Sequence, residues 1–194
     1  MAPITRDSLM TLEAYAKVRG EFRTKVLAHK RPRTVTLGEH LRLLFEDELT
    51  LRYQIQEMLR IEKTFEEQGI QDELDVYNPL VPDGSNLKAT LQVEYDDVEA
   101  RRAALSRLKG VEDRVYVEVE GFERVFAIAD EDLERENEHK TSAVHFVRFE
   151  LDPPMITALK KGAALGVGVD HPEYREHVAA VPRETRQALV ADLA

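Results

Sequence analysis

The sequence predicts an α+β fold in which a mainly antiparallel sheet, built from hairpins, packs against one long helix and several shorter helices. Segments of alternating apolar and polar residues follow each other across short turns, as in hairpins. One segment, 48–68, instead repeats its apolar residues with a helical period. Strand-like and helix-like segments alternate irregularly, which is typical of α+β proteins. The length of 194 residues fits a single domain, 1–194.

The first 30 residues form a predicted helical N-terminal segment. Asp7 and Ser8 can cap a helix over 9–18, and Gly20 separates it from a second helix over 21–29. A hairpin follows within 34–45.

The long helix is expected to begin after Asp47, which can cap it, and to end at Gly69. Turn residues then fill the segment up to Asn86. The remaining elements carry similar signals: strand 87–95, helix 97–108, two strands around Glu120–Gly121, strand 142–151, helix 153–161, a strand or loop at 163–170, and helix 183–193. Residues 171–194 are interpreted as a C-terminal extension.

Two polar residues of the long helix, Gln54 and Glu62, fall on its apolar side. A buried carboxylate without a partner costs several kcal/mol or becomes protonated. We therefore expect Glu62 to meet Arg114, His145 or Arg148. Two interpretations stay open: Glu62 is a paired carboxylate that holds helix to sheet, or it lines a polar pocket.

The polar side of this helix and the following proline-bearing loop form a predicted binding surface for a ligand or partner. Loops on a rigid scaffold often carry binding groups, and arginines can pair with carboxylates of a partner or an anionic ligand. The residues of this surface are Arg52, Tyr53, Gln56, Arg60, Tyr77 and Asn86, with Glu62 beside them.

A metal site is the alternative prediction. His171, Glu173 and His177 offer two imidazoles and a carboxylate within seven residues, a set that can bind a divalent metal. A polar surface turn explains the same residues. Glu136 and His139 have the spacing of a di-iron ligand pair, but such sites need two pairs. Otherwise no cofactor is predicted.

Composition excludes several classes of function. The chain has no cysteine, which excludes disulfides, thiolate catalysis and cysteine-ligated clusters. Its net charge of −10 disfavours nucleic acid and anionic membrane surfaces as partners. No apolar run approaches the length of a membrane span, and the N-terminus lacks a signal-peptide core. We expect a cytoplasmic protein.

Three long segments resemble a bacterial family known only as a domain of unknown function. They are TLGEHLRLLFEDELTLRYQIQEMLRIEKTFEEQGIQDELDVYNPLVPDGSNLKATLQVEY, ADEDLERENEHKTSAVHFVRFEL and GVDHPEY. The resemblance implies genes encoded beside rubrerythrin-like and iron–sulfur oxidoreductase proteins, and hence a link to peroxide handling or redox balance. It implies no catalytic residue.

These observations predict an accessory or binding protein of a cytosolic redox or oxidative-stress system. Its partner would be a redox protein of the rubrerythrin-like or iron–sulfur oxidoreductase kind, and it could form a homodimer. The alternatives are a small-molecule enzyme or metalloprotein that uses Glu62 or the His171 and His177 cluster, and a purely structural subunit.

Overall fold

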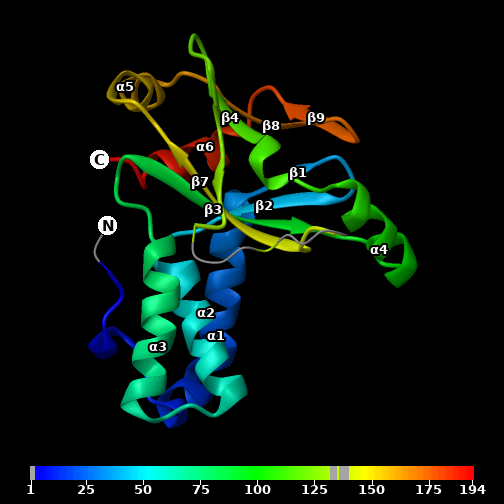
Figure 1. The fold of residues 1–194 in the computed structure, drawn as a ribbon. Helices are drawn as coiled ribbons and strands as arrows, with labels where there is room; N and C mark the ends of the chain where they lie inside the picture. Colours follow the sequence, from blue (N-terminus) through cyan, green and yellow to red (C-terminus); the bar gives the residue numbers. More distant parts are fainter. Residues whose placement is uncertain (1–2, 132–134, 136–139) are drawn as a thin grey trace.

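The computed structural model describes residues 3–131, 135 and 140–194 and confirms the α+β class (Figure 1). The strands form two antiparallel sheets, and a bundle of three helices projects from them. In the described residues the strand order is β1-β2-β3-β7-β6 in the first sheet and β5-β4-β8-β9 in the second. No helix of the described part combines the length and apolarity needed to cross a bilayer.

The bundle begins with η1 (Arg6–Ser8) and α1 (Leu12–Lys30). The prediction of two N-terminal helices was wrong, because α1 continues through Gly20 without a break. Gly20 is exposed, and a single glycine costs a helix only about 1 kcal/mol relative to alanine. The packing of α1 against α2 therefore outweighs the low helix propensity of this residue.

The predicted long helix is in fact two helices, α2 (Glu48–Glu62) and α3 (Glu67–Tyr77). Asp47 caps α2 as predicted, accepting from the Thr50 amide at 2.9 Å. The helix ends at Lys63, whose backbone is left-handed with φ 55°. The chain reverses there, so α3 returns along α2 and occupies part of the expected loop.

The first sheet contains the predicted hairpin. Its strands are β1 (Thr34–Leu37), β2 (Leu41–Phe45), β3 (Asn86–Val93), β7 (Val144–Glu150) and β6 (Ile128–Ala129). Each neighbouring pair is antiparallel. The alternation predicted for β7 is confirmed: His145, Val147 and Phe149 are buried on one face.

The second sheet contains a strand that the sequence analysis missed. Its strands are β5 (Arg124–Phe126), β4 (Val115–Val119), β8 (Leu165–His171) and β9 (Tyr174–Val178). The edge strand β9 reads YREHV, which has too few apolar residues to give a strand pattern. The second of the two strands predicted around Glu120–Gly121 is divided at Ala127. Its first part, β5, pairs with β4, whereas its second part, β6, pairs with β7 of the other sheet.

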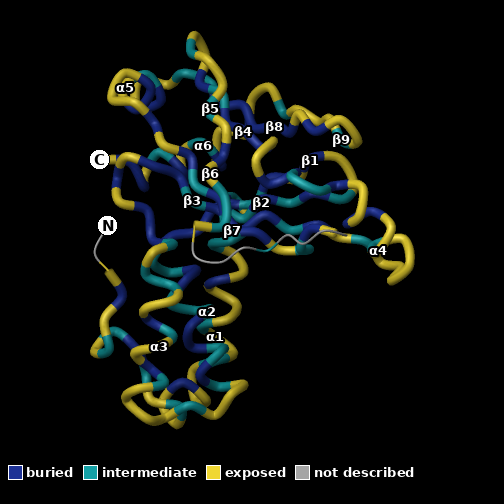
Figure 2. The backbone as a smooth tube through the Cα atoms, viewed as in Figure 1, coloured by how far each residue is buried: buried dark blue, intermediate teal, exposed yellow. Residues whose placement is uncertain are grey.

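The main core lies between the two sheets and is closed by α4 (Val98–Arg107), α5 (Pro153–Lys161) and α6 (Arg183–Val190). A smaller core fills the helical bundle. In Figure 2 exposed residues dominate the far end of that bundle. Leu189 and Leu193 are buried in the main core, so residues 171–194 are an integral part of the fold.

Short helices connect several of these elements: η2 (Arg31–Arg33), η3 (Asn78–Leu80) and η4 (Glu112–Arg114). The buried Arg33 joins the bundle to the C-terminal helix, since its guanidinium contacts Asp47 at 3.0 Å and Asp192 at 2.7 Å.

Candidate metal centre

The candidate site is built around His145, a fully buried histidine in β7. Because side chains alternate along a strand, His145 lies on the inward face with Val147 and Phe149. It is paired in register with Leu91 of β3. The imidazole is thus fixed at the edge of the core between the sheets.

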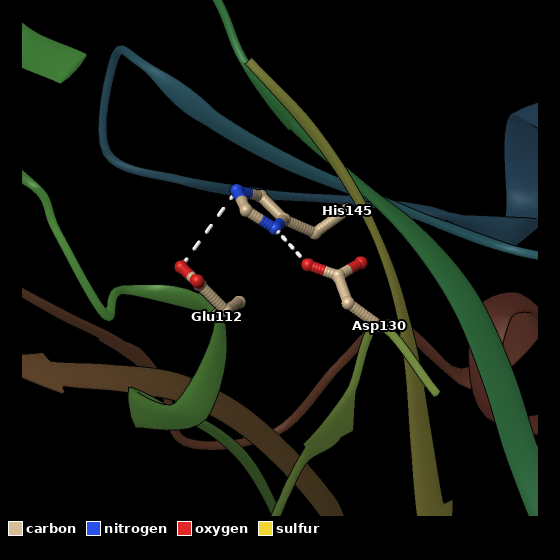
Figure 3. A group of neighbouring side chains, drawn as sticks. All are labelled: Glu112, Asp130 and His145. Atoms are coloured by element: carbon tan, nitrogen blue, oxygen red, sulfur yellow. Dashed lines mark hydrogen bonds and ion pairs between the residues drawn. The ribbon is translucent and has the colours of Figure 1, made fainter. Parts of the chain in front are cut away.

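A carboxylate faces each nitrogen of this ring (Figure 3). Asp130 Oδ2 lies 2.5 Å from Nδ1, and Glu112 Oε2 lies 3.7 Å from Nε2. Two further oxygens approach Nε2: Thr141 Oγ1 at 2.9 Å and the Ser142 carbonyl at 3.1 Å. Three oxygens therefore converge on one ring nitrogen.

The backbone of β7 holds Asp130 in place. Its Oδ1 accepts from the Phe146 amide at 3.1 Å, and its own amide donates to the Phe146 carbonyl at 2.9 Å. Arg135 Nη1 lies 3.2 Å from the same Oδ1. Asp130 has φ 48°, a left-handed conformation that is uncommon outside glycine. These contacts leave Oδ2 directed at His145.

Glu112 and Thr141 come from two other parts of the chain. Glu112 lies in η4, just before β4, and is 7% exposed. Thr141 is 1% exposed, and its amide donates to the Leu105 carbonyl at 3.1 Å. The Thr141 hydroxyl lies 3.3 Å from Glu112 Oε2, so these two oxygens are neighbours as well.

This arrangement suits a carboxylate–histidine–metal centre. A hydrogen bond from Nδ1–H to Asp130 leaves the Nε2 lone pair free, which is how second-shell carboxylates orient histidine ligands. Ligands about 2.1 Å from one ion lie about 3.0–3.4 Å apart in octahedral or tetrahedral geometry. The three oxygens lie 2.9, 3.1 and 3.7 Å from Nε2, and the Thr141 and Glu112 oxygens lie 3.3 Å from each other, which is close to that range. Among the described residues, Glu112, Asp130 and His145 form a group of possible metal ligands with one donor atom each within 4.8 Å of the others, and Asp130 is the member that faces Nδ1.

The family of the chain is identified by its sequence. A family model described as a protein of unknown function, DUF3501, matches residues 3–193. The chain belongs to the DUF3501 family. A crystal structure from Burkholderia pseudomallei K96243, also described as a novel protein of unknown function, shares 60% identity over 100% of both chains, with a TM-score of 0.95. No curated protein matches. The resemblance to a family of unknown function is confirmed, and the DUF3501 fold is shared with that relative.

The inward position predicted for Glu62 was wrong. Glu62 is exposed at the end of α2, and Ile61 and Phe65 beside it are 60% and 74% exposed. The cause is the early end of α2 at Lys63, which leaves the last turn without a packing partner on that side. Two of its expected partners bind other carboxylates: His145 faces Asp130 and Glu112, and Arg148 pairs with Glu131.

Gln56 and Glu57 are the polar side chains by which α2 contacts α1 and the residues just before it. Gln56, which was expected on the outer side, is fully buried, and its side chain accepts from the Met10 amide at 2.6 Å. Glu57 binds Arg19 at 2.8 Å, Tyr15 at 2.7 Å and Arg60 at 3.1 Å. The Arg19 hydrogen bonds above all, with those of Arg60 and Tyr15, lower the pKa of Glu57 to about 2 against the effect of burial.

The other residues of the predicted binding surface are dispersed. Arg52 pairs with Glu48 at 3.2 Å, while the Tyr53 ring lies beside Phe22 of α1. Tyr77 is half-buried next to Gln54, and burial raises the pKa of its phenol. Asn86 is buried, and it donates to Asp83 at 2.8 Å and to Glu150 at 2.7 Å. Most of these groups hold elements of the fold together.

The predicted metal ligands His171, Glu173 and His177 do not converge. His171 follows Val169 on the core face of β8, whereas His177 pairs with Gly168 on the opposite face of the same sheet. The period-two alternation of strands thus separates the two imidazoles. The Lys109 carbonyl contacts His171 Nε2 at 2.9 Å, and the Glu173 amide donates to Nδ1 at 3.2 Å. The Glu136 and His139 pair lies outside the described residues.

Sequence reasoning missed four residues of the centre: Glu112, Asp130, Thr141 and Ser142. Each lies in a polar segment just before or after a strand. The segments are far apart in the sequence, so the residues form no recognisable motif. The available signal was His145 itself, because a histidine on the apolar face of a strand needs a hydrogen-bonding partner.

Proposed function

We propose that this protein binds one divalent transition-metal ion at His145 Nε2, with Glu112, the Thr141 hydroxyl and the Ser142 carbonyl as further ligands. Asp130 would orient the imidazole from the Nδ1 side. The observation that carries the proposal is the convergence of three oxygens on Nε2. A single N–H can donate well to only one of them, whereas a cation can bind all three.

The ligand set favours a particular class of metal. One imidazole with carboxylate, hydroxyl and carbonyl oxygens is typical of Fe²⁺, Mn²⁺ or Zn²⁺ rather than of Cu⁺, which prefers sulfur. A histidine held by hydrogen bonds alone is the competing arrangement, because Asp130 and the Thr141 hydroxyl can each form a hydrogen bond with one ring nitrogen. The two arrangements differ in whether the protein takes up metal.

Metal analysis of protein purified without a histidine tag tests the proposal. We expect about one Zn²⁺, Mn²⁺ or Fe²⁺ per chain after incubation and desalting, because histidine and carboxylate ligands are deprotonated and retain metal at neutral pH. His145→Gln should abolish this stoichiometry, and His177→Ala, on the outer face of the other sheet, should keep it. Substoichiometric metal in folded wild-type protein would overturn the proposal and leave a histidine held by hydrogen bonds alone.

The redox role, the cytoplasmic location and the homodimer remain predictions. A protein metal centre with one histidine and oxygen ligands is compatible with a companion role beside rubrerythrin-like or iron–sulfur oxidoreductase proteins, and the family resemblance supports that role. Affinity capture from native lysate should recover such a partner, and deletion of the gene should alter peroxide sensitivity. If neither effect is observed, the redox assignment is wrong even if the metal centre is real.

A further inference from the structure

We propose that a second site, on the outer face of the first sheet, binds the carboxylate of a small amphipathic acid. The site is a pocket of about 240 Å³ between η3 and strands β3, β6 and β7. Leu80, Ile128 and Phe146 supply apolar walls, and Lys88 and Arg148 supply positive charge. The pocket does not involve the His145 ring, which projects from the other face of β7.

The register of the sheet places two cations side by side. Lys88 of β3 is directly opposite Arg148 of β7, and Ile128 of β6 is opposite Arg148 on its other side. The three side chains therefore form one row across the same face. Like charges that are directly opposite destabilise a sheet unless an anion lies near both.

The two cations differ in how their charge is balanced. Arg148 donates to both oxygens of Glu131, at 2.9 and 2.8 Å, and pairs with Glu150. Lys88 Nζ donates instead to the Pro79 carbonyl at 2.7 Å and the Val81 carbonyl at 3.0 Å. Within the part of the chain that the structure describes, no carboxylate lies within 4.0 Å of this ammonium. Burial lowers the pKa of Lys88, against the opposite effect of the more distant carboxylates of Asp83, Glu150 and Glu131.

An ammonium has three hydrogens, and two of those of Lys88 are used by carbonyls. A ligand carboxylate could accept the third and also bind Arg148 in the bidentate way that Glu131 does now. The Glu131 side chain is 55% exposed, so water can solvate it when it is displaced. Glu131 thus acts as an internal competitor for the ligand.

The size and surroundings of the pocket restrict the ligand. Pockets for drug-sized molecules span roughly 300–1,000 Å³, so this one fits a short aliphatic chain or a single ring. The net charge of −10 repels polyanions. A monocarboxylate with an apolar tail satisfies both conditions.

Calorimetric titration of the full chain with hexanoate tests this inference, with 1-hexanol as a probe of equal length and no charge. We expect saturable one-site binding of hexanoate, at least about tenfold tighter than hexanol, since hexanol cannot form the charged hydrogen bonds. Lys88→Met should weaken hexanoate binding about tenfold or more, since one charged hydrogen bond is lost. Lys161→Met, at the exposed end of α5, is the matched control and should leave the affinity unchanged.

Glu131→Gln provides a second variant that does not depend on the folding of Lys88→Met. It removes the internal competitor, so hexanoate should bind more tightly than to the wild type. Equal affinity for hexanoate and hexanol would overturn the proposal, and so would hexanoate binding that is unaffected by both Lys88→Met and Glu131→Gln.

Discussion

Asp130→Asn changes the proposed metal centre by one atom. The Oδ1 of Asp130 accepts from the Phe146 amide and faces Arg135, so the oxygen of the new amide should remain there. The new NH₂ group would then face His145 Nδ1, where Oδ2 lies at 2.5 Å in the wild type. Because an amide NH₂ only donates, Nδ1 must accept, and the ring proton moves to Nε2. A metal would have to displace that proton.

The expected effect on affinity is about 10–100-fold, the usual cost of losing a second-shell partner of a histidine ligand. At a free metal concentration about 100 times the wild-type Kd, binding stabilises the fold by about 2.7 kcal/mol. For a variant with a Kd about 100-fold weaker, the same concentration gives only about 0.4 kcal/mol. The difference, about 2.3 kcal/mol, corresponds to roughly 5–9 °C in Tm for a chain of this size.

The assay is thermal unfolding of wild type and variant with and without Zn²⁺, followed by circular dichroism. Asp170→Asn is the matched control, because Asp170 is an exposed aspartate of β8 in the other sheet, where it pairs with Arg124 and Arg175. An increase in Tm on metal addition that is as large for Asp130→Asn as for the wild type would refute the role given to Asp130.

Three further predictions concern stability. Gly20→Ala should raise the free energy of unfolding by about 1 kcal/mol in urea titrations, because a Cβ there meets nothing within 4 Å in an exposed helix; an unchanged midpoint would argue against a continuous α1. Gly168→Ala should lower the free energy of unfolding by about 1–3 kcal/mol, because the new Cβ would clash with the buried Tyr116 ring. An unchanged free energy of unfolding would mean that the ring moves freely. Glu57→Gln should remove part of the acid sensitivity of the fold. The pKa of Glu57 falls from an ordinary value of 4.5 to about 2 on folding, so its stabilisation is full above pH 4.5 and is lost as the pH falls towards 2. Urea titrations between these pH values should show a smaller loss for the variant, and parallel curves would contradict the assignment.

Much of the fold could be predicted from local patterns. The hairpin of β1 and β2, the helix from Pro153 and the alternation of β7 each depend on neighbouring residues, and each was found. The break between α2 and α3 was missed because its cause is a left-handed conformation at Lys63, a residue type that gives no turn signal. The strand β9 was missed because an edge strand needs no apolar face.

The candidate site was only partly predictable. The expectation that Glu62 would be buried and meet Arg114, His145 or Arg148 was wrong, and the carboxylates that face His145 are Asp130 and Glu112. Helical periodicity could identify Glu62 as inward only if α2 packed along its whole length, and its last turn does not. The partners of His145 come from separate loops, so their proximity depends on how the two sheets are placed.

The segment that passes through Ala127 has a mechanical consequence. Within six residues it contributes hydrogen bonds to both sheets, first to β4 through β5 and then to β7 through β6. Local unfolding of this segment would break hydrogen bonds to both sheets. The two sheets should therefore unfold as one cooperative unit. Asp130 immediately follows this shared segment, so an ion bound beside it would cross-link the two sheets.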